Sequence, residues 1–310
     1  MLEAALWITA IVIGLVLLVL SGDKLSDKIV EVARKAGVSP LVISIVLISL
    51  ATTLPELLTS AVASYQGLTG MALGNALGSI FANIALILGI AATLRPLKAT
   101  REAYDNSLIM LGSFLLVMAL SADGTLSRLD GAVLLGAYVV YLRWLLKKNA
   151  RKDIDGDGDG RATVLDYAIL FVLGLLLVLG AKLVVYGGAN IAEALGISEF
   201  VIGATIVAIG TSLPEMTNAV YGALRERGSI SIGNIIGADI MNALVVLGVA
   251  SVIRPLQTGA SILTVILVLA AMLPMVVSLR KTHGLGRPMG IYFLALYSLY
   301  IVLMFSGVEL

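Results

Sequence analysis

The segment "ATTLPELLTS" (Ala51–Ser60) lies within a long apolar run, yet it contains hydroxyl side chains, a proline and a carboxylate, Glu56. The pattern returns as "GTSLPEMTNA" (Gly210–Ala219), where Glu215 occupies the corresponding position. A charged side chain at the centre of a bilayer costs several kcal/mol on most scales. Two such carboxylates in apolar surroundings therefore indicate a functional site.

The composition is that of an integral membrane protein. Of the 310 residues, 59% are hydrophobic and 13% are charged, whereas soluble domains carry about 25% charged residues. The absence of cysteine excludes a disulfide framework and thiolate chemistry. The net charge of +1 gives no indication of a nucleic-acid partner, and the single histidine, His283, lies in a basic loop, where we expect it to be solvated.

Ten apolar segments approach the roughly 20 residues that a membrane-spanning helix needs. They cover approximately residues 4–20, 39–64, 71–94, 104–121, 129–147, 165–187, 198–222, 230–253, 259–279 and 288–307. The first lacks a basic leader and a small-residue cleavage site, so we expect a retained helix. All but three of the 21 basic residues (Arg128, Lys182 and Arg254) fall in loops on one side. This asymmetry predicts both termini outside a cell (plasma) membrane and a cytoplasmic central loop.

The two halves of the chain repeat each other at an offset of 159 residues. This offset pairs Glu56 with Glu215, Asn75 with Asn234, Asn83 with Asn242, and Arg95 with Arg254. We expect a first repeat at 1–147, a linker at 148–164 and a second repeat at 165–310. Five helices per repeat is an odd number, so the second repeat is inverted in the membrane, as in many secondary transporters. A duplicated structural bundle is the alternative, but it does not explain why polar residues are the best-kept part of the repeat.

Each proline removes a backbone donor and clashes with the carbonyl four residues earlier, so it predicts a break in its helix. Freed carbonyls are tolerated in a membrane only where they are buried in protein or line a cavity. Thr52 and Glu56 are four residues apart and share a helix face, as do Thr211 and Glu215. Such an all-oxygen set suits a hard cation such as calcium or sodium. A proline kink with a snorkelling glutamate is the alternative for one copy, but two matched copies weigh against it.

The segments "GNALGSIFAN" (Gly74–Asn83) and "GNIIGADIMN" (Gly233–Asn242) are the predicted partner helices. Asn75, Ser79 and Asn83 recur every four residues and share one face. Glycines at small-xxx-small spacing on an adjacent stripe allow another backbone to approach closely. Asn83 and Asn242 are expected to face an ion, whereas interhelical hydrogen bonding is the alternative role for Asn75 and Asn234.

The paired motifs "TTLPE…GNALGSIFAN" and "TSLPE…GNIIGADIMN" resemble the alpha repeats of the sodium/calcium exchanger branch of the cation/calcium antiporter superfamily, and the resemblance covers nearly the whole chain. It implies an all-α integral membrane protein with ten transmembrane helices in two inverted five-helix repeats. It also implies four clustered ion sites, one for calcium and the rest used mainly by sodium. The ligands implied by motif position are Thr52, Thr53, Glu56, Ser79, Asn83, Thr211, Ser212, Glu215 and Asn242, with backbone carbonyls near Ser49 and Ala208.

The second repeat departs from the family pattern at two positions. Ala238 stands where the family usually has serine, which puts one sodium ligand in doubt. Asp239 stands where asparagine is common, and an acid inside a membrane is a functional candidate. It lies one residue, about 100°, off the Asn234/Asn242 face of a regular helix. Asn242 itself argues against potassium dependence, because potassium-dependent members usually carry an acid there.

The hydrophilic central segment "DGDGDGRATVLD" (Asp155–Asp166) has the spacing of an EF-hand calcium loop and resembles its dockerin-type variant. The expected ligands are Asp155, Asp157, Asp159, the carbonyl of Arg161, and Asp166. The alternative is a solvated Asp/Gly linker.

The sequence therefore predicts a secondary antiporter in which inward sodium drives calcium out by alternating access, with the first and sixth helices rocking across a fixed core. An antiporter that exchanges protons for calcium or another divalent cation is the main alternative, and a channel would conduct calcium without a counter-ion. We expect no enzyme activity, because we find no metalloprotease motif and no serine–base pair. The expected partners are calcium, sodium and the lipid bilayer, with no cofactor; the sequence does not give the oligomeric state.

Overall fold

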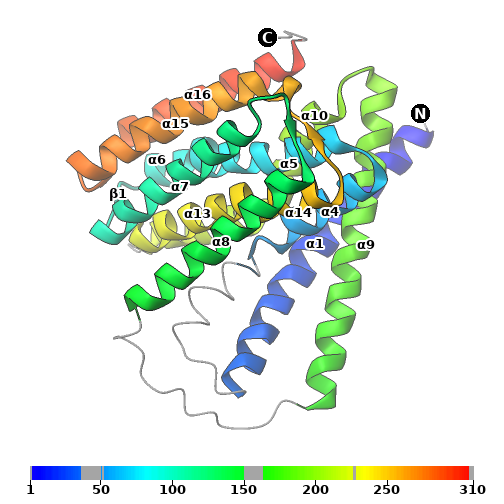
Figure 1. Cartoon of the computed structure of the whole chain (residues 1–310), viewed down its shortest axis with the longest axis horizontal. Helices are drawn as coiled ribbons and strands as arrows, with labels where there is room; N and C mark the ends of the chain where they lie inside the picture. The colour runs from blue at the N-terminus through cyan, green and yellow to red at the C-terminus, as the bar shows by residue number, and fades with distance from the viewer. Residues whose placement is uncertain (1, 36–49, 51, 150–162, 226–227, 307–310) are drawn as a thin grey trace.

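The computed structural model describes residues 2–35, 50, 52–149, 163–225 and 228–306, and they form an almost entirely helical molecule (Figure 1). The elements of the first half are α1 (Leu2–Lys35), α4 (Leu54–Gln66), α5 (Thr69–Phe81), the π-helix η2 (Ala82–Leu88), α6 (Gly89–Leu94), β1 (Leu97–Lys98), α7 (Arg101–Leu120), β2 (Thr125–Leu126) and α8 (Arg128–Asn149).

The elements of the second half begin with α9 (Val164–Leu195), α10 (Glu199–Ile202), the π-helix η4 (Gly203–Val207), α11 (Ala208–Thr211), α12 (Leu213–Leu224) and α13 (Gly228–Met241). They continue with the π-helix η5 (Asn242–Val246), α14 (Leu247–Ile253), β3 (Leu256–Gln257), the 3₁₀ helix η6 (Gly259–Ser261), α15 (Ile262–Lys281), β4 (Gly284–Leu285) and α16 (Arg287–Phe305).

Within these residues, eight helices are long and apolar enough to span a membrane. A ninth span consists of two segments, Glu199–Thr211 and Leu213–Leu224, which meet at an angle of 50°. The predicted span at residues 39–64 is only partly described, and α4 forms its second part. The architecture therefore agrees with the predicted ten-helix, inverted-repeat membrane fold.

At the second motif the helix breaks as the sequence predicts, and at the first motif a new helix, α4, begins at Leu54, directly before Pro55. Thr53 (φ −91°, ψ 2°) precedes α4, and Ser212 (φ −85°, ψ 12°) separates α11 from α12. Pro55 and Pro214 each lie in the first turn of the helix that follows, where a missing N–H costs nothing. The carboxylates that come next, Glu56 and Glu215, are therefore held in the first turn of a helix.

Two small antiparallel sheets join the repeats. β1 pairs with β4, with Leu97 opposite Leu285, and β2 pairs with β3, with Thr125 opposite Gln257. The 159-residue offset maps β1 onto β3 and β2 onto β4. Each sheet therefore combines one strand from each repeat, as expected when two equivalent halves are related by an internal two-fold axis.

The centre of the molecule is formed by the spans Thr69–Leu94 and Gly228–Ile253. In these spans 78% and 83% of the most apolar window is buried, compared with 28% and 33% in α1 and α9. The glycines of the first span allow close packing on the second repeat: a Cβ on Gly78 would lie 2.5 Å from the carbonyl oxygen of Ala204. The small-xxx-small seam is thus a backbone-to-backbone contact between repeats.

The two longest helices, α1 and α9, lie side by side along one side of the molecule (Figure 1). They meet at glycines: a Cβ on Gly14 would lie 2.7 Å from the oxygen of Gly180. The sequence predicts a first span at 4–20, but α1 continues to Lys35. The extension is amphipathic, because Leu25 and Ala33 on its inner face are buried while charged residues occupy the outer face.

Candidate ion-binding site

The two glutamates of the repeated motif lie deep in the molecule, and each is 1% exposed. Glu56 Oε1 accepts a hydrogen bond of 3.0 Å from Ser212 Oγ, and Thr211 lies beside the same carboxylate. Glu215 in turn has Thr52 of the first motif next to it, although neither of its oxygens reaches hydrogen-bonding geometry with a described residue. Each carboxylate therefore faces the hydroxyls of the opposite repeat.

The helix ends add to this arrangement. Glu56 and Glu215 occupy the first turns of α4 and α12, where free backbone N–H groups and the helix dipole favour negative charge. Both carboxylates are thereby stabilised in part before any cation arrives. Such a pair can hold a cation deep in an apolar bundle without a basic side chain beside it.

A second group of polar side chains comes from the central spans. Ser79, Asn83 and Asp239 are fully buried, and Asn242 is 1% exposed. Asn83 Nδ2 donates a hydrogen bond of 2.8 Å to Asp239 Oδ1, which joins the repeats. Asp239 is also close enough to Glu56 and Glu215 for their charges to interact. The structure therefore brings Asp239 into the same cluster as the two glutamates.

The helices that carry these residues change to π-helical geometry at the cluster. The π-helix η2 begins at Ala82, next to Asn83, and η5 begins at Asn242. π-Helical turns in α-helices occur frequently at functional sites. The sequence contains no signal for them that we recognise, so the helical face assumed for Asn242 and Asp239 was that of a regular α-helix.

Asn75 forms interhelical hydrogen bonds, which is the structural role given above as its alternative. Its Nδ2 donates to the backbone oxygen of Glu56 (3.1 Å) and to Ser60 Oγ (2.9 Å), while its Oδ1 accepts from Thr211 Oγ1 (3.2 Å). It thereby fastens the two broken helices to the central span. Asn234 differs, because it is only half-buried and its Nδ2 has no partner among the described residues.

The remaining predicted ligands lie around the two breaks. Thr53 is buried at the start of α4, and Thr211 and Ser212 are buried at the second break. The carbonyl of Ala208 accepts from Thr211 Oγ1 (3.3 Å) and from the Ser212 N–H (3.1 Å). The predicted carbonyl near Ser49 lies outside the described residues.

Several buried polar atoms in this region have no hydrogen-bond partner within the described part of the chain. They are Glu56 Oε2, Ser79 Oγ, Asn83 Oδ1, both oxygens of Glu215, Asp239 Oδ2, and both polar atoms of the Asn242 amide. An unsatisfied buried polar group costs about 1–3 kcal/mol, and more when it is charged. A desolvated cation bound among the oxygen atoms of this set would offset most of that cost.

The described acids of this cluster do not form a compact three-carboxylate metal site. Within the described residues, no group of three histidine, cysteine, aspartate or glutamate side chains converges on one metal position. Most of the oxygen donors near Glu56 and Glu215 are instead hydroxyls, amides and backbone carbonyls. A set of mostly neutral oxygen ligands with a few carboxylates suits sodium or calcium ions bound at neighbouring positions.

A cavity of about 270 Å³ leads to the motif from the Lys35 end of α1. Its lining residues are Gly22, Asp23, Ser26, Asp27 and Val30 of α1, together with Thr52, Pro55, Pro214 and Asn218. Thr52 therefore connects the open cavity with the buried Glu215. Two acids at the α1 wall give the approach a negative lining, which favours cations.

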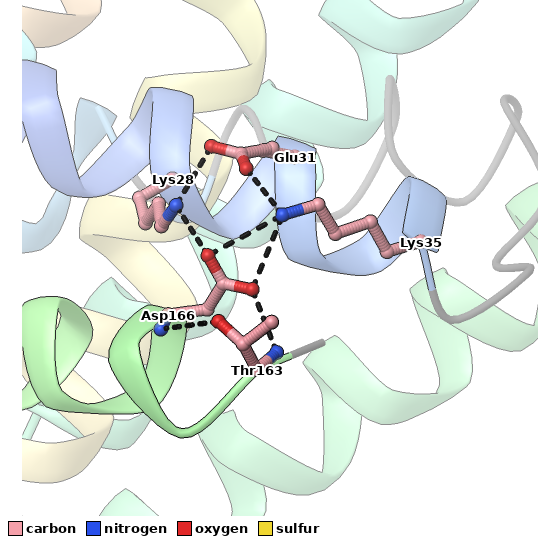
Figure 2. Close-up of polar contacts among 5 residues, drawn as sticks. All are labelled: Lys28, Glu31, Lys35, Thr163 and Asp166. Atoms are coloured by element: carbon pink, nitrogen blue, oxygen red, sulfur yellow. Dashed lines mark hydrogen bonds and ion pairs between the residues drawn. The ribbon is translucent and has the colours of Figure 1, made fainter. Parts of the chain in front are cut away.

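The one described carboxylate of the predicted calcium loop, Asp166, has other partners. It accepts from the backbone N–H of Thr163 (2.8 Å) as part of a capping box, and it pairs with Lys28 and Lys35 (Figure 2). These are not the partners that the loop spacing predicts for it. Asp155, Asp157, Asp159 and Arg161 lie outside the described residues.

A family model described as "Sodium/calcium exchanger protein" matches residues 6–147 and 165–306. The chain belongs to the sodium/calcium exchanger family. Sodium/calcium exchanger MaX1 of Methanosarcina acetivorans is 30% identical over 340 residues, covering 95% of this chain and 97% of the relative. An uncharacterized membrane protein of Methanocaldococcus jannaschii is 36% identical over 296 residues, covering 95% and 97%.

Solved structures of a family member have the same fold. The sodium-calcium exchanger NCX_Mj, soaked with 2.5 mM Na⁺ and 10 mM Sr²⁺, is 36% identical to this chain, with a TM-score of 0.68. The alignment covers 96% of this chain and 99% of NCX_Mj. As a member of the exchanger family with many apolar spans, the chain is a multi-pass membrane protein of ion transport, and its family is one of transporters.

Proposed function

We propose that this exchanger carries out sodium/calcium antiport by alternating access. The observation that supports this most is the set of buried oxygens around Glu56 and Glu215 that have no hydrogen-bond partner among the described residues; they lie at the starts of α4 and α12. A structural bundle would be more stable if these groups were paired or apolar. A transporter needs them free for its cargo.

The proposed ligands come from both repeats. They are Thr52, Thr53, Glu56, Ser79 and Asn83 of the first, and Ala208 (carbonyl), Thr211, Ser212, Glu215, Asp239 and Asn242 of the second. The two glutamates supply about two negative charges, enough to neutralise one calcium ion. Sodium ions would use overlapping ligands, and competition for shared ligands is what makes the process an exchange.

The proposed orientation follows the basic residues and places both termini outside the cell membrane. The Lys35 end of α1, and the cavity beside it, would then be cytoplasmic. In that arrangement the described state is open towards the cytoplasm, since the cavity reaches Thr52. The switch to the opposite state would be a rocking of α1 and α9 across the central spans.

Calcium-45 uptake by vesicles containing the purified protein tests this function. We expect uptake when the vesicles are loaded with sodium and diluted into sodium-free buffer, and none when sodium is equal on both sides. Uptake driven by a proton gradient without sodium would instead assign a proton/calcium antiporter. Uptake down a calcium gradient with no counter-ion would indicate a channel and contradict antiport.

A further inference from the structure

Four charged residues join the end of α1 to the beginning of α9 (Figure 2). Lys28 Nζ lies 2.6 Å from Asp166 Oδ1, and Lys35 Nζ lies 3.1 Å from Asp166 Oδ2. Glu31 bridges the same two lysines on α1, at 2.9 Å from Lys28 and 2.6 Å from Lys35. We call these four residues the ionic clamp. It connects the first helix of one repeat to the first helix of the other.

The clamp is more than a pair of exposed charges. Isolated surface ion pairs contribute little to stability, but networks of several charges with good geometry are the exception. The Asp166 side chain is only 6% exposed, and its oxygens accept from two ammonium groups and from the Thr163 N–H. Glu31 and Asp166 both raise the pKa of Lys35, so Lys35 stays charged at neutral pH.

Close contacts at several heights hold α1 and α9 together. The glycine contact between Gly14 and Gly180 fixes the spacing of the helices within the membrane, and the clamp fixes their ends. A pair of helices held at two separated points resists both sliding and splaying.

The clamp lies on the same stretch of α1 as the wall of the cavity. Asp23, Ser26 and Asp27 line the cavity that reaches Thr52. Lys28, on the neighbouring stripe of the same turns, reaches Asp166 of α9, and Glu31 pairs with Lys28 on α1. The clamp therefore connects α9 to the turns of α1 that border the cavity.

We propose that the ionic clamp makes the end of α1 move with α9 during exchange, so that it sets the turnover rate and leaves ion affinity unchanged. This inference rests on the proposed antiport function. The clamp residues are positioning residues, because they do not line the cavity and do not belong to the ion cluster.

A covalent replacement of the clamp tests the inference directly, because the chain contains no cysteine. We would combine Lys28→Cys with Asp166→Cys and measure sodium-driven calcium-45 exchange before and after joining the two thiols with a short bifunctional reagent. Before joining, we expect a several-fold lower maximal rate with unchanged apparent affinities for calcium and sodium. After joining, the rate should recover.

Two results would overturn the proposal. One is a joined protein that no longer exchanges while the unjoined protein does, because α1 and α9 would then have to move apart in each cycle. The other is an unjoined variant that exchanges at the wild-type rate. Failure of the wild-type protein itself to exchange sodium for calcium would contradict the proposed function instead, so the two failures are distinguishable.

A second variant covers the case in which loss of Asp166 prevents folding by removing the cap of α9. Lys28→Met with Lys35→Met removes the clamp but leaves the capping box of Thr163 and Asp166 intact. We expect the same loss of maximal rate without a change of affinity. Lys24→Met is the matched control, since Lys24 is exposed on α1 and no ion pair is found for it in the described residues. A wild-type rate for the Lys28/Lys35 variant would also overturn the proposal.

Discussion

Glu215 and Asp166 are both buried acids in the first turn of a helix, but they differ in how the protein satisfies their carboxylate oxygens. Asp166 is paired with two lysines and a backbone N–H at the end of the α1–α9 pair. Glu215, at the break between α11 and α12, faces hydroxyls of the other repeat and has oxygens without a hydrogen-bond partner within the described chain. The carboxylate of Asp166 is thus satisfied by protein groups, whereas that of Glu215 is available for the cation that we propose it binds.

The largest expected difference between the two acids concerns calcium transport. Glu215→Gln or Glu56→Gln should abolish exchange without unfolding the protein, because the cluster then lacks the charge to neutralise a divalent cation. Asp166→Asn should only slow exchange. Calcium-45 flux and a thermal melt of each purified variant make the measurement. If either glutamine variant exchanged calcium at a near wild-type rate, the substituted glutamate would not belong to the ion-binding site.

A second comparison sets the tightly packed centre against the lipid-facing surface. Gly78→Ala would place a Cβ 2.5 Å from the oxygen of Ala204, where the backbones of two repeats meet. We expect a loss of about 1–3 kcal/mol of stability or more, which is the usual cost of overpacking. Gly112→Ala is the matched control, because no heavy atom lies within 4 Å of its added Cβ. Equal melting temperatures for the two variants would contradict the packing described for the central spans.

Asp239 tests whether the cluster extends beyond the two glutamates. Asp239→Asn removes an ionisable carboxyl group while keeping a side-chain oxygen that can accept the hydrogen bond from Asn83. We expect the apparent affinity for calcium to fall roughly tenfold, equivalent to about 1.4 kcal/mol, with the fold unchanged. Glu193→Gln, an exposed acid on α9, is the control. A calcium titration identical to wild type would make Asp239 a structural partner of Asn83, comparable with Asp166 rather than with Glu215.

The smallest expected effect is that of Ala238→Ser. Ala238 is buried next to Asp239 in α13. A serine there would add one neutral oxygen, so it should raise the apparent affinity for sodium modestly and leave that for calcium nearly unchanged. Sodium titrations of exchange at fixed calcium provide the measurement. An unchanged sodium dependence would show that residue 238 does not border an ion position.

The fold was predictable because the 159-residue repeat and the ten apolar segments can be recognised directly in the order of the residues. The breaks at Pro55 and Pro214 were predictable for the same reason, since proline acts on its own helix. The extension of α1 to Lys35 was missed because a count of apolar residues ends where an amphipathic turn begins.

The candidate site was less completely predictable. The position of Asp239 was judged only from its angle to Asn234 and Asn242 on a regular helix. Its partner, Asn83, comes from the other repeat, and π-helical turns follow in both central spans. Asp166 fits a calcium-loop spacing in the sequence, yet Lys28 and Lys35 reach it from a helix far away in the chain. Spacing along one segment does not contain these tertiary contacts.

The most direct test of the account is to locate bound strontium, an electron-rich substitute for calcium, by anomalous diffraction from crystals soaked without sodium. We expect one strong peak between Glu56 and Glu215, within ligand distance of both carboxylates, and loss of that peak when sodium is added in excess. No peak at this position in crystals of protein that still exchanges calcium, or a peak that sodium does not displace, would contradict the claim that the two broken helices share one exchangeable calcium site.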